Sequence, residues 1–290
     1  MNDIPKAISL KIKSMQRGEI TEYYVYKNIA KRVKDASNKE ILLKIANDEM
    51  RHYNVWKTFL GEEAKPNRLK IFYFTTLAFL FGYTFTLKLM ERGEDRANDY
   101  YTEIGEYSDQ AKQIAMEEDE HEKALIGMLD EERLSYVGSM VLGLNDALVE
   151  LSGALAGLTF AFTDTKLISL SGLITGIAAS LSMAASQYLS SKADGRPDAL
   201  KSSVYTGIAY VVTVAILITP YLLLGNQYIA LGVMLFSVVL IIFLFNYYIS
   251  VAKDLEFKKR FFQMAIISLS VAVISFFIGI LVKKFLGVDI

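Results

Sequence analysis

The hydrophobic and polar positions of the chain change character near residue 135. Before that point, apolar residues are interleaved with charged ones, and the pattern predicts four helices with bounds Pro5–Lys34, Asn38–Leu60, Asn67–Ile104 and Ser108–Arg133. After it, five long apolar segments follow, with expected bounds Val137–Thr163, Leu167–Leu189, Ser202–Leu224, Gln227–Ala252 and Phe261–Val282. Each is long enough to cross a bilayer, because about 20 residues of helix span the hydrocarbon core. The pattern therefore predicts an all-α chain, with a helical bundle in residues 1–135 and a five-helix transmembrane domain in residues 136–290.

Turn residues and small residues refine these elements. Gly61 to Pro66 predicts a stop after the second helix, Ser37 or Asn38 is expected to cap that helix, and Ser108 or Asp109 the fourth. In the membrane half, two Gly-x-x-x-Gly patterns predict helix faces that allow close approach, at Gly153 and Gly157 and at Gly172 and Gly176.

One apolar stretch lies in the first half, where Ile71 to Leu87 contains 17 residues without a charge. We do not expect it to span the membrane, because 17 residues is the short limit for a span. We expect it to be the apolar seam of the bundle, a dimer face or a surface that rests on the membrane.

Composition and charge exclude several classes of protein. The 32 acidic and 31 basic residues give a net charge of -1, so there is no basic footprint for nucleic acid. The absence of cysteine excludes disulfides, iron–sulfur clusters and Cys-ligated zinc. Residues 1–15 have no apolar core and do not resemble a secretory signal. Basic residues gather in the loops near Arg196 and Lys258, which places those loops and the N-terminal domain in the cytosol. We expect a multi-pass protein of the cell membrane.

Both histidines of the chain stand in the same short pattern. Glu49 and His52 are three residues apart, as are Glu118 and His121, so each pair shares one helix face and can bind one metal ion. Two such pairs, with Glu19 and Glu91 each preceding one of them, match the ligands of ferritin-like di-metal bundles. The domain is similar to the rubrerythrin branch, through Glu19 with Tyr26 and through the paired carboxylates Glu91 and Glu94. The resemblance implies a di-iron site, or another pair of Fe, Mn or Zn ions, with metal ligands Glu19, Glu49, His52, Glu91, Glu94, Glu118 and His121.

The first apolar segment contains two acids, Asp146 and Glu150, on one helix face. Acids at membrane depth are costly and therefore indicate function, although the span could instead begin after them. The residues Val141 to Leu148, together with Ser182-Met183 and Gln187 to Leu189, resemble the vacuolar iron transporter family. The resemblance implies that Asp146 and Met183 lie on a transport pathway, and a carboxylate with a thioether suits iron(II). Thr175 departs from the family's expected glutamate, a role that Glu150 could take, and the family's cytosolic metal-binding insert is missing.

A ferritin-like module before a transporter-like module resembles the membrane-bound ferritins. The sequence thus predicts a divalent metal transporter that exports iron(II) or manganese(II) from the cytosol by proton antiport, as a homodimer in the lipid bilayer. Its cytosolic di-iron domain would capture, sense or oxidise the metal. No catalytic residue is predicted. The alternatives are a membrane-anchored di-iron ferroxidase or peroxide-scavenging protein, and a sensor whose metal occupancy gates the pore.

Overall fold

The computed structural model describes residues 6–90, 109–127 and 136–286. Within these ranges the regular structure is helical and contains no strand, which confirms the all-α prediction. The chain divides into two compact units, Met1–Glu131 and Glu132–Ile290, and each has its own hydrophobic core.

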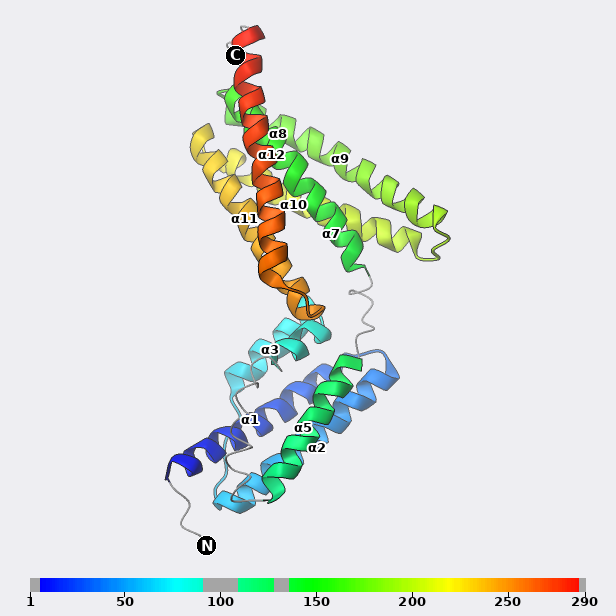
Figure 1. Ribbon diagram of the computed structural model, residues 1–290, viewed down its shortest axis with the longest axis vertical. Helices are drawn as coiled ribbons and strands as arrows, with labels where there is room; N and C mark the ends of the chain where they lie inside the picture. The colour runs from blue at the N-terminus through cyan, green and yellow to red at the C-terminus, as the bar shows by residue number, and fades with distance from the viewer. Residues whose placement is uncertain (1–5, 91–108, 128–135, 287–290) are drawn as a thin grey trace. The chain divides into compact units, whose positions relative to one another are not determined.

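The first unit is built on a pair of long helices (Figure 1). Its labelled helices are α1 (Lys6–Ala30), α2 (Ala36–Leu60), α3 (Arg68–Phe81) and α5 (Asp109–Gly127), and residues 83–90 are also helical. α1 packs along α2, while α5 packs on α2 and α3 on α1. Tyr26, Leu42 and Ile45 are buried in one core cluster, and Ile12 and Trp56 in a second.

The ends of α2 follow ordinary capping chemistry. At its N-terminus the side chain of Asp35 accepts a hydrogen bond from the backbone N–H of Asn38 at 2.8 Å. The prediction that Ser37 or Asn38 caps this helix was wrong, because Asp35 satisfies the free N–H one turn in. At the C-terminus Gly61 has φ 68°, which confirms the predicted stop. Of the residues expected to cap the fourth helix, Ser108 lies outside the described residues and α5 begins at Asp109.

The predicted single helix Asn67–Ile104 is interrupted at Gly82, so that prediction was wrong. Gly82 has φ 94° and ψ 157°, a conformation essentially restricted to glycine. α3 therefore ends at Phe81, and a new helical stretch begins at residue 83. An apolar pattern alone does not reveal this break, because glycine is tolerated within helices at a modest cost of about 1 kcal/mol. Residues 91–104 lie outside the described residues.

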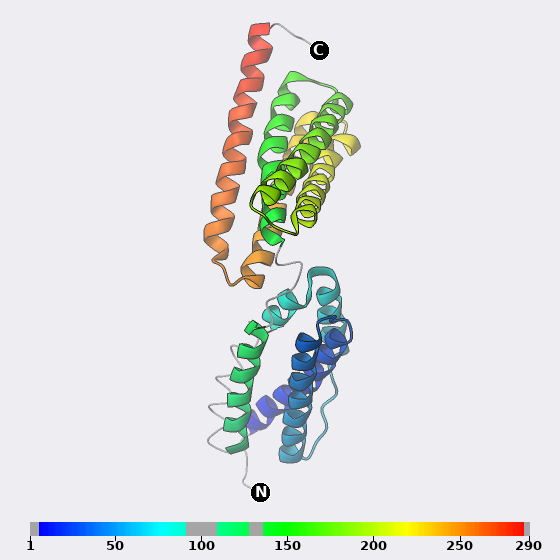
Figure 2. The same ribbon diagram turned by 90° about the vertical axis from the view of Figure 1, so that its right-hand side faces the viewer.

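The second unit holds the long apolar helices (Figures 1 and 2). Its elements are α7 (Val137–Asp146), the π-helical turn η1 (Ala147–Leu151), α8 (Ser152–Ala161), α9 (Thr165–Ala193), α10 (Ala199–Leu223), α11 (Gln227–Ala252) and α12 (Phe257–Leu286). The continuous run of α7, η1 and α8 counts as one span. Among the described residues, five helices are then long and apolar enough to cross a membrane, as predicted.

Both Gly-x-x-x-Gly patterns lie at close helix contacts, which confirms that prediction. A Cβ added at Gly176 on α9 would lie 2.6 Å from Val214 Cγ1 on α10. A Cβ at Gly157 on α8 would lie 3.3 Å from the backbone oxygen of Ser275 on α12. A further glycine not predicted in this role, Gly143 on α7, allows no Cβ at all, since that atom would lie 2.3 Å from the Thr206 backbone oxygen.

Candidate metal centre

Four predicted ligands from three helices converge in the first unit. Glu19 on α1, Glu49 and His52 on α2, and Glu118 on α5 each place one ligand atom within 4.8 Å of the others. The Nδ1 atom of His52 lies 2.9 Å from Glu118 Oε1 and 3.6 Å from Glu19 Oε2. All four are buried or nearly so, so the cluster is held inside the bundle. One imidazole and three carboxylates form a donor set suited to manganese, iron, cobalt or zinc.

The second histidine lies beside the same cluster. His121 Nδ1 is 3.4 Å from Glu49 Oε1 and 3.4 Å from Glu118 Oε2, and its ring stacks 5.8 Å from that of His52. Glu49 and Glu118 thus each face both histidines.

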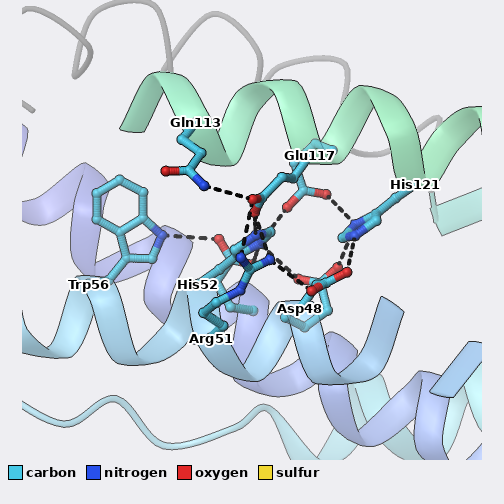
Figure 3. Close-up of polar contacts among 10 residues, drawn as sticks. Asp48, Arg51, His52, Trp56, Gln113, Glu117 and His121 are labelled. Carbon is cyan, nitrogen blue, oxygen red and sulfur yellow. Dashed lines mark hydrogen bonds and ion pairs between the residues drawn. The ribbon is translucent and has the colours of Figure 1, made fainter. Parts of the chain in front are cut away.

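The acid that precedes each Glu-x-x-His pair holds the histidine of the other helix (Figure 3). On α5, Glu117 accepts a hydrogen bond from His52 Nε2 at 2.7 Å, and on α2, Asp48 accepts one from His121 Nε2 at 3.2 Å. Arg51 joins the two acids, with Asp48 at 2.8 Å and Glu117 at 2.9 Å. These bonds leave the Nδ1 atom of each ring directed at the cluster, as a metal-binding histidine requires.

Glu19 is oriented by a separate contact. The indole Nε1 of Trp56, a fully buried side chain, donates a hydrogen bond to Glu19 Oε1 at 3.1 Å. The other carboxylate oxygen of Glu19, Oε2, faces His52. Trp56 therefore fixes which Glu19 oxygen is available to a metal ion.

The hydrogen bonding of the ligand atoms tests whether a metal ion fits this site. Several of these atoms are buried and lack a hydrogen bond of good geometry. Among the described residues these include Glu49 Oε2, His52 Nδ1, Glu118 Oε1 and His121 Nδ1. Buried polar atoms are almost always satisfied, and each one that is not carries a penalty of about 1–3 kcal/mol. The four atoms belong to the two Glu-x-x-His pairs, so the residues present fit a bound metal ion.

Charge coupling within the cluster shifts several pKa values. Burial, reinforced by Glu118 and Glu19, raises the pKa of Glu49 well above its usual range. Burial alone would lower the pKa of His52, but the adjacent carboxylates of Glu118 and Glu19 outweigh it and raise the pKa to about 10. Burial opposes ionisation of Glu118 as well, yet the two histidines lower its pKa to about 2. Without metal, the site therefore holds protons that an incoming cation must displace.

Several residues of this cluster were predicted from the sequence. These are Glu19, Glu49, His52, Glu118 and His121, which the structure brings together. The predicted ligands Glu91 and Glu94 lie outside the described residues. Asp48 was missed, although an acid directly before each Glu-x-x-His pair is visible in the sequence.

In the second unit, the two predicted membrane acids lie beside a tyrosine. The Tyr210 hydroxyl on α10 donates a hydrogen bond to Glu150 Oε2 at 3.1 Å, and Asp146 stands four residues before Glu150 in the same span. Asp146 directly precedes the π-helical turn Ala147–Leu151 and Glu150 lies within it, and such a local irregularity is frequent at functional sites. Tyr210 was not predicted, and only the packing of α10 against η1 reveals it.

This acidic pair lies within a recognisable segment. Residues 137–196 match the VIT family. That family comprises the vacuolar iron transporters, so the match confirms the resemblance predicted for this part of the chain. No curated protein and no solved structure matches the chain. The VIT segment and the five apolar helices together support a multi-pass membrane protein.

The remaining predicted residues of the VIT segment lie on α9. Met183 on α9 is partly buried against the apolar core, and Thr175 is exposed on the same helix. Among the described residues, Asp146 and Glu150 belong to no group of three or more Asp, Glu or His ligands. The contacts in this segment thus bring together two carboxylates and the Tyr210 hydroxyl of α10.

A cavity of about 490 Å³ adjoins the first span. Asn145 and Val149 line it from the VIT segment, and Asn246 and Met264 from α11 and α12. Asn246 donates a hydrogen bond to the Met264 sulfur at 3.2 Å. Neither Asp146 nor Glu150 lines this cavity, so it is not the acidic site.

Proposed function

We propose that the protein is a membrane transporter that exports a divalent metal ion, iron(II) or manganese(II), from the cytosol. The observation that carries this proposal is the pair of acids in the VIT segment, Asp146 and Glu150, on a helix otherwise apolar enough to cross a membrane. A carboxylate in a bilayer is costly unless it faces a polar or water-filled interior, and carboxylates in such places mark ion pathways. The match of this segment to the vacuolar iron transporters supports metal as the transported ion.

We propose that protons are exchanged for the metal ion, and charge balance at this pair supports it. Two carboxylates offset the charge of one divalent cation, and two protons offset it equally when the cation leaves. The Tyr210 hydroxyl, bonded to Glu150, keeps one oxygen of that carboxylate oriented in either state. Alternating occupancy by one metal ion or two protons avoids an uncompensated charge in the membrane.

We further propose that the pathway is completed by a second copy of the chain. Glu150 is exposed in the single chain even though it lies in a membrane-capable helix. Exposure to lipid would leave that carboxylate without solvation, whereas a two-fold contact would pair it with the same acids of the partner. Such a homodimer brings four carboxylates to one axis, enough for a complete metal site.

The first unit would capture or sense the cytosolic metal. Its buried cluster of Glu19, Glu49, His52 and Glu118 offers a site that the VIT segment does not contain in one chain. We propose that His121, with Glu91 and Glu94, completes a second metal position and hence a di-iron site of the ferritin-like type. This unit would then take the role of the cytosolic metal-binding insert that the chain lacks.

Metal flux in proteoliposomes tests the transport proposal. Asp146→Asn and Glu150→Gln should each abolish iron(II) and manganese(II) flux, and an imposed proton gradient should change the rate of the unmodified protein. Asp194→Asn, an isosteric change at an exposed residue after α9, serves as the control and should transport normally. Unchanged flux in Asp146→Asn would refute the proposal.

A second function has its own support in the buried Glu and His cluster, namely a membrane-anchored ferroxidase or peroxide-scavenging protein. Iron bound there would supply one-electron redox chemistry with oxygen or peroxide. Oxygen consumption on adding iron(II), compared between the unmodified protein and Glu49→Ala, measures this activity directly. Consumption that needs Glu49, combined with no metal flux, would favour this function over transport.

A further inference from the structure

The outer face of α3 is apolar and exposed. Along its 14 residues, none is buried in the unit. Its inner face, through Ile71, Phe74 and Ala78, packs against the core cluster of α1 and α2. Its outer face is a stripe at helical spacing that consists of Leu69, Phe72, Tyr73, Phe79 and Leu80, with exposed fractions from 53% to 81%. We call these five residues the α3 stripe.

The length of α3 decides how it can meet a bilayer. Its 14 residues extend about 21 Å at 1.5 Å per residue, short of the hydrocarbon core of about 30 Å. Gly82 then breaks the helix, and the following residues Phe85, Leu87 and Met90 are buried in the protein. An apolar helix of this length that is neither buried nor spanning is typical of an interfacial segment.

A basic groove adjoins the α3 stripe. It has a volume of about 450 Å³ and is lined by Arg32 and Asn28 of α1 and by residues of α3 that include Arg68, Thr76 and Phe79. The Arg32 guanidinium lies over the Phe79 ring, 5.4 Å from its centroid. Among the described residues, neither Arg32 nor Arg68 forms an ion pair with a carboxylate. Two guanidinium groups beside an amide and a hydroxyl form a set of donors suited to phosphate.

The charge of this surface favours lipid over a second copy of the chain. α3 contains no acidic residue, so a two-fold contact through the stripe would supply no carboxylate of α3 for Arg32 or Arg68. An anionic bilayer supplies both an apolar layer for the stripe and phosphates for the groove. Because the unit is covalently joined to five membrane-capable helices, it always experiences a high local concentration of lipid.

We propose that α3 is a membrane-surface anchor whose stripe enters the interfacial region of the bilayer while Arg32 and Arg68 bind the phosphate of anionic phospholipids. This anchor is independent of the metal centre, since it uses none of the ligands. Its role would be to hold the metal-binding unit at the lipid surface. The composition of the membrane would thereby set how much of the protein has this unit docked.

Site-specific fluorescence tests this anchor in the full chain, which has no cysteine of its own. An environment-sensitive label on Tyr73→Cys is compared with one on Leu10→Cys, an exposed position of α1 in the same unit. Each protein is placed in nanodiscs of phosphatidylcholine, with or without phosphatidylglycerol, that contain a brominated quenching lipid. The label at position 73 should be quenched strongly in the anionic discs, and the label at position 10 should not.

Charge variants then separate the groove from general electrostatics. Each basic residue near an anionic surface strengthens binding about fivefold, so Arg32→Gln with Arg68→Gln should lower the ratio of docked to undocked protein about 25-fold. Lys39→Gln with Lys44→Gln removes the same charge from exposed positions of α2 and should leave quenching near the unmodified level. Manganese(II) binding, measured on each variant, verifies that the unit remains folded.

Three results would overturn the proposal. The first is quenching at position 73 no greater than at position 10. The second is equal quenching in neutral and anionic discs, with no response to the arginine variants. The third is disulfide formation between two Tyr73→Cys chains without lipid quenching, which would identify the stripe as a contact between copies.

Discussion

The hydrogen bonds that Glu117 and Asp48 accept from the two histidines yield a quantitative prediction about metal affinity. Glu117→Gln keeps the shape of the side chain but replaces the carboxylate that accepts a hydrogen bond from His52 Nε2 at 2.7 Å. Loss of such a partner lowers metal affinity by about 10- to 100-fold, equivalent to about 1.4–2.7 kcal/mol. Asp48→Asn should have a smaller effect, because its bond to His121 is longer at 3.2 Å. The expected order of affinity is therefore the unmodified protein, then Asp48→Asn, then Glu117→Gln.

The raised pKa of His52 makes the expected loss of metal affinity in Glu117→Gln somewhat smaller. The Glu117 carboxylate also stabilises the protonated ring, so its loss should reduce the competition between protons and metal. That change strengthens metal binding slightly and offsets part of the loss. The full effect of Glu117→Gln should consequently be seen at high pH, where the unmodified protein holds fewer competing protons.

Anaerobic titration with manganese(II) or cobalt(II), in competition with a chromophoric chelator, measures the dissociation constant. Glu120→Gln is the matched control, since it makes the same change of charge on α5 at an exposed position. It should bind metal as the unmodified protein does. If Glu117→Gln binds the metal ion no more weakly than Glu120→Gln does, the hydrogen bond from His52 to Glu117 does not support the metal centre and the reasoning is refuted.

Three more predictions follow from the geometry. Metal affinity should rise between pH 6 and pH 8, by about tenfold per pH unit for each proton released. The reason is that the pKa of His52 is raised to about 10 and its ring must lose a proton to bind metal. Calorimetry in buffers of different ionisation enthalpy counts the protons released. Glu49→Gln should abolish metal binding yet leave the unfolding temperature of the metal-free protein unchanged or higher. The reason is that burial raises the pKa of the Glu49 carboxyl and favours its neutral form, which glutamine resembles. A fall in the unfolding temperature would contradict this reasoning. Gly143→Ala should destabilise the membrane unit by about 1–3 kcal/mol, because the new Cβ would lie 2.3 Å from the Thr206 backbone oxygen. Gly138→Ala is the control and should be tolerated, because a Cβ there has no neighbouring atom within 4 Å. A thermal unfolding assay compares the two variants.

Sequence patterns were most informative where one local rule sufficed. The five membrane-capable helices follow from length and hydropathy alone, which is why their number agrees with the structure. The pairing of Glu49 with His52, and of Glu118 with His121, follows from helical spacing. The stop at Gly61 follows from the ability of glycine to adopt positive φ. Each of these needs only residues that are close together in the chain.

Features that depend on distant residues were missed or misplaced. The break at Gly82 is followed by residues 83–90, most of which are buried, and the apolar pattern on both sides of it is continuous. The role of Asp48 depends on α5 meeting α2, which brings its carboxylate to a histidine 73 positions later. Tyr210 joins Glu150 across 60 positions for the same reason.

The sequence by itself thus determined the helical class, the apolar spans and the residues that could bind metal, because spacing within one helix decides which side chains share a face. The tertiary structure alone decided which of those faces meet. It brought Glu19, Glu49, His52 and Glu118 to one point, assigned each histidine its acid on the opposite helix, and left the α3 stripe exposed. Packing between helices depends on the side chains of both partners, and no pattern along one segment contains that information.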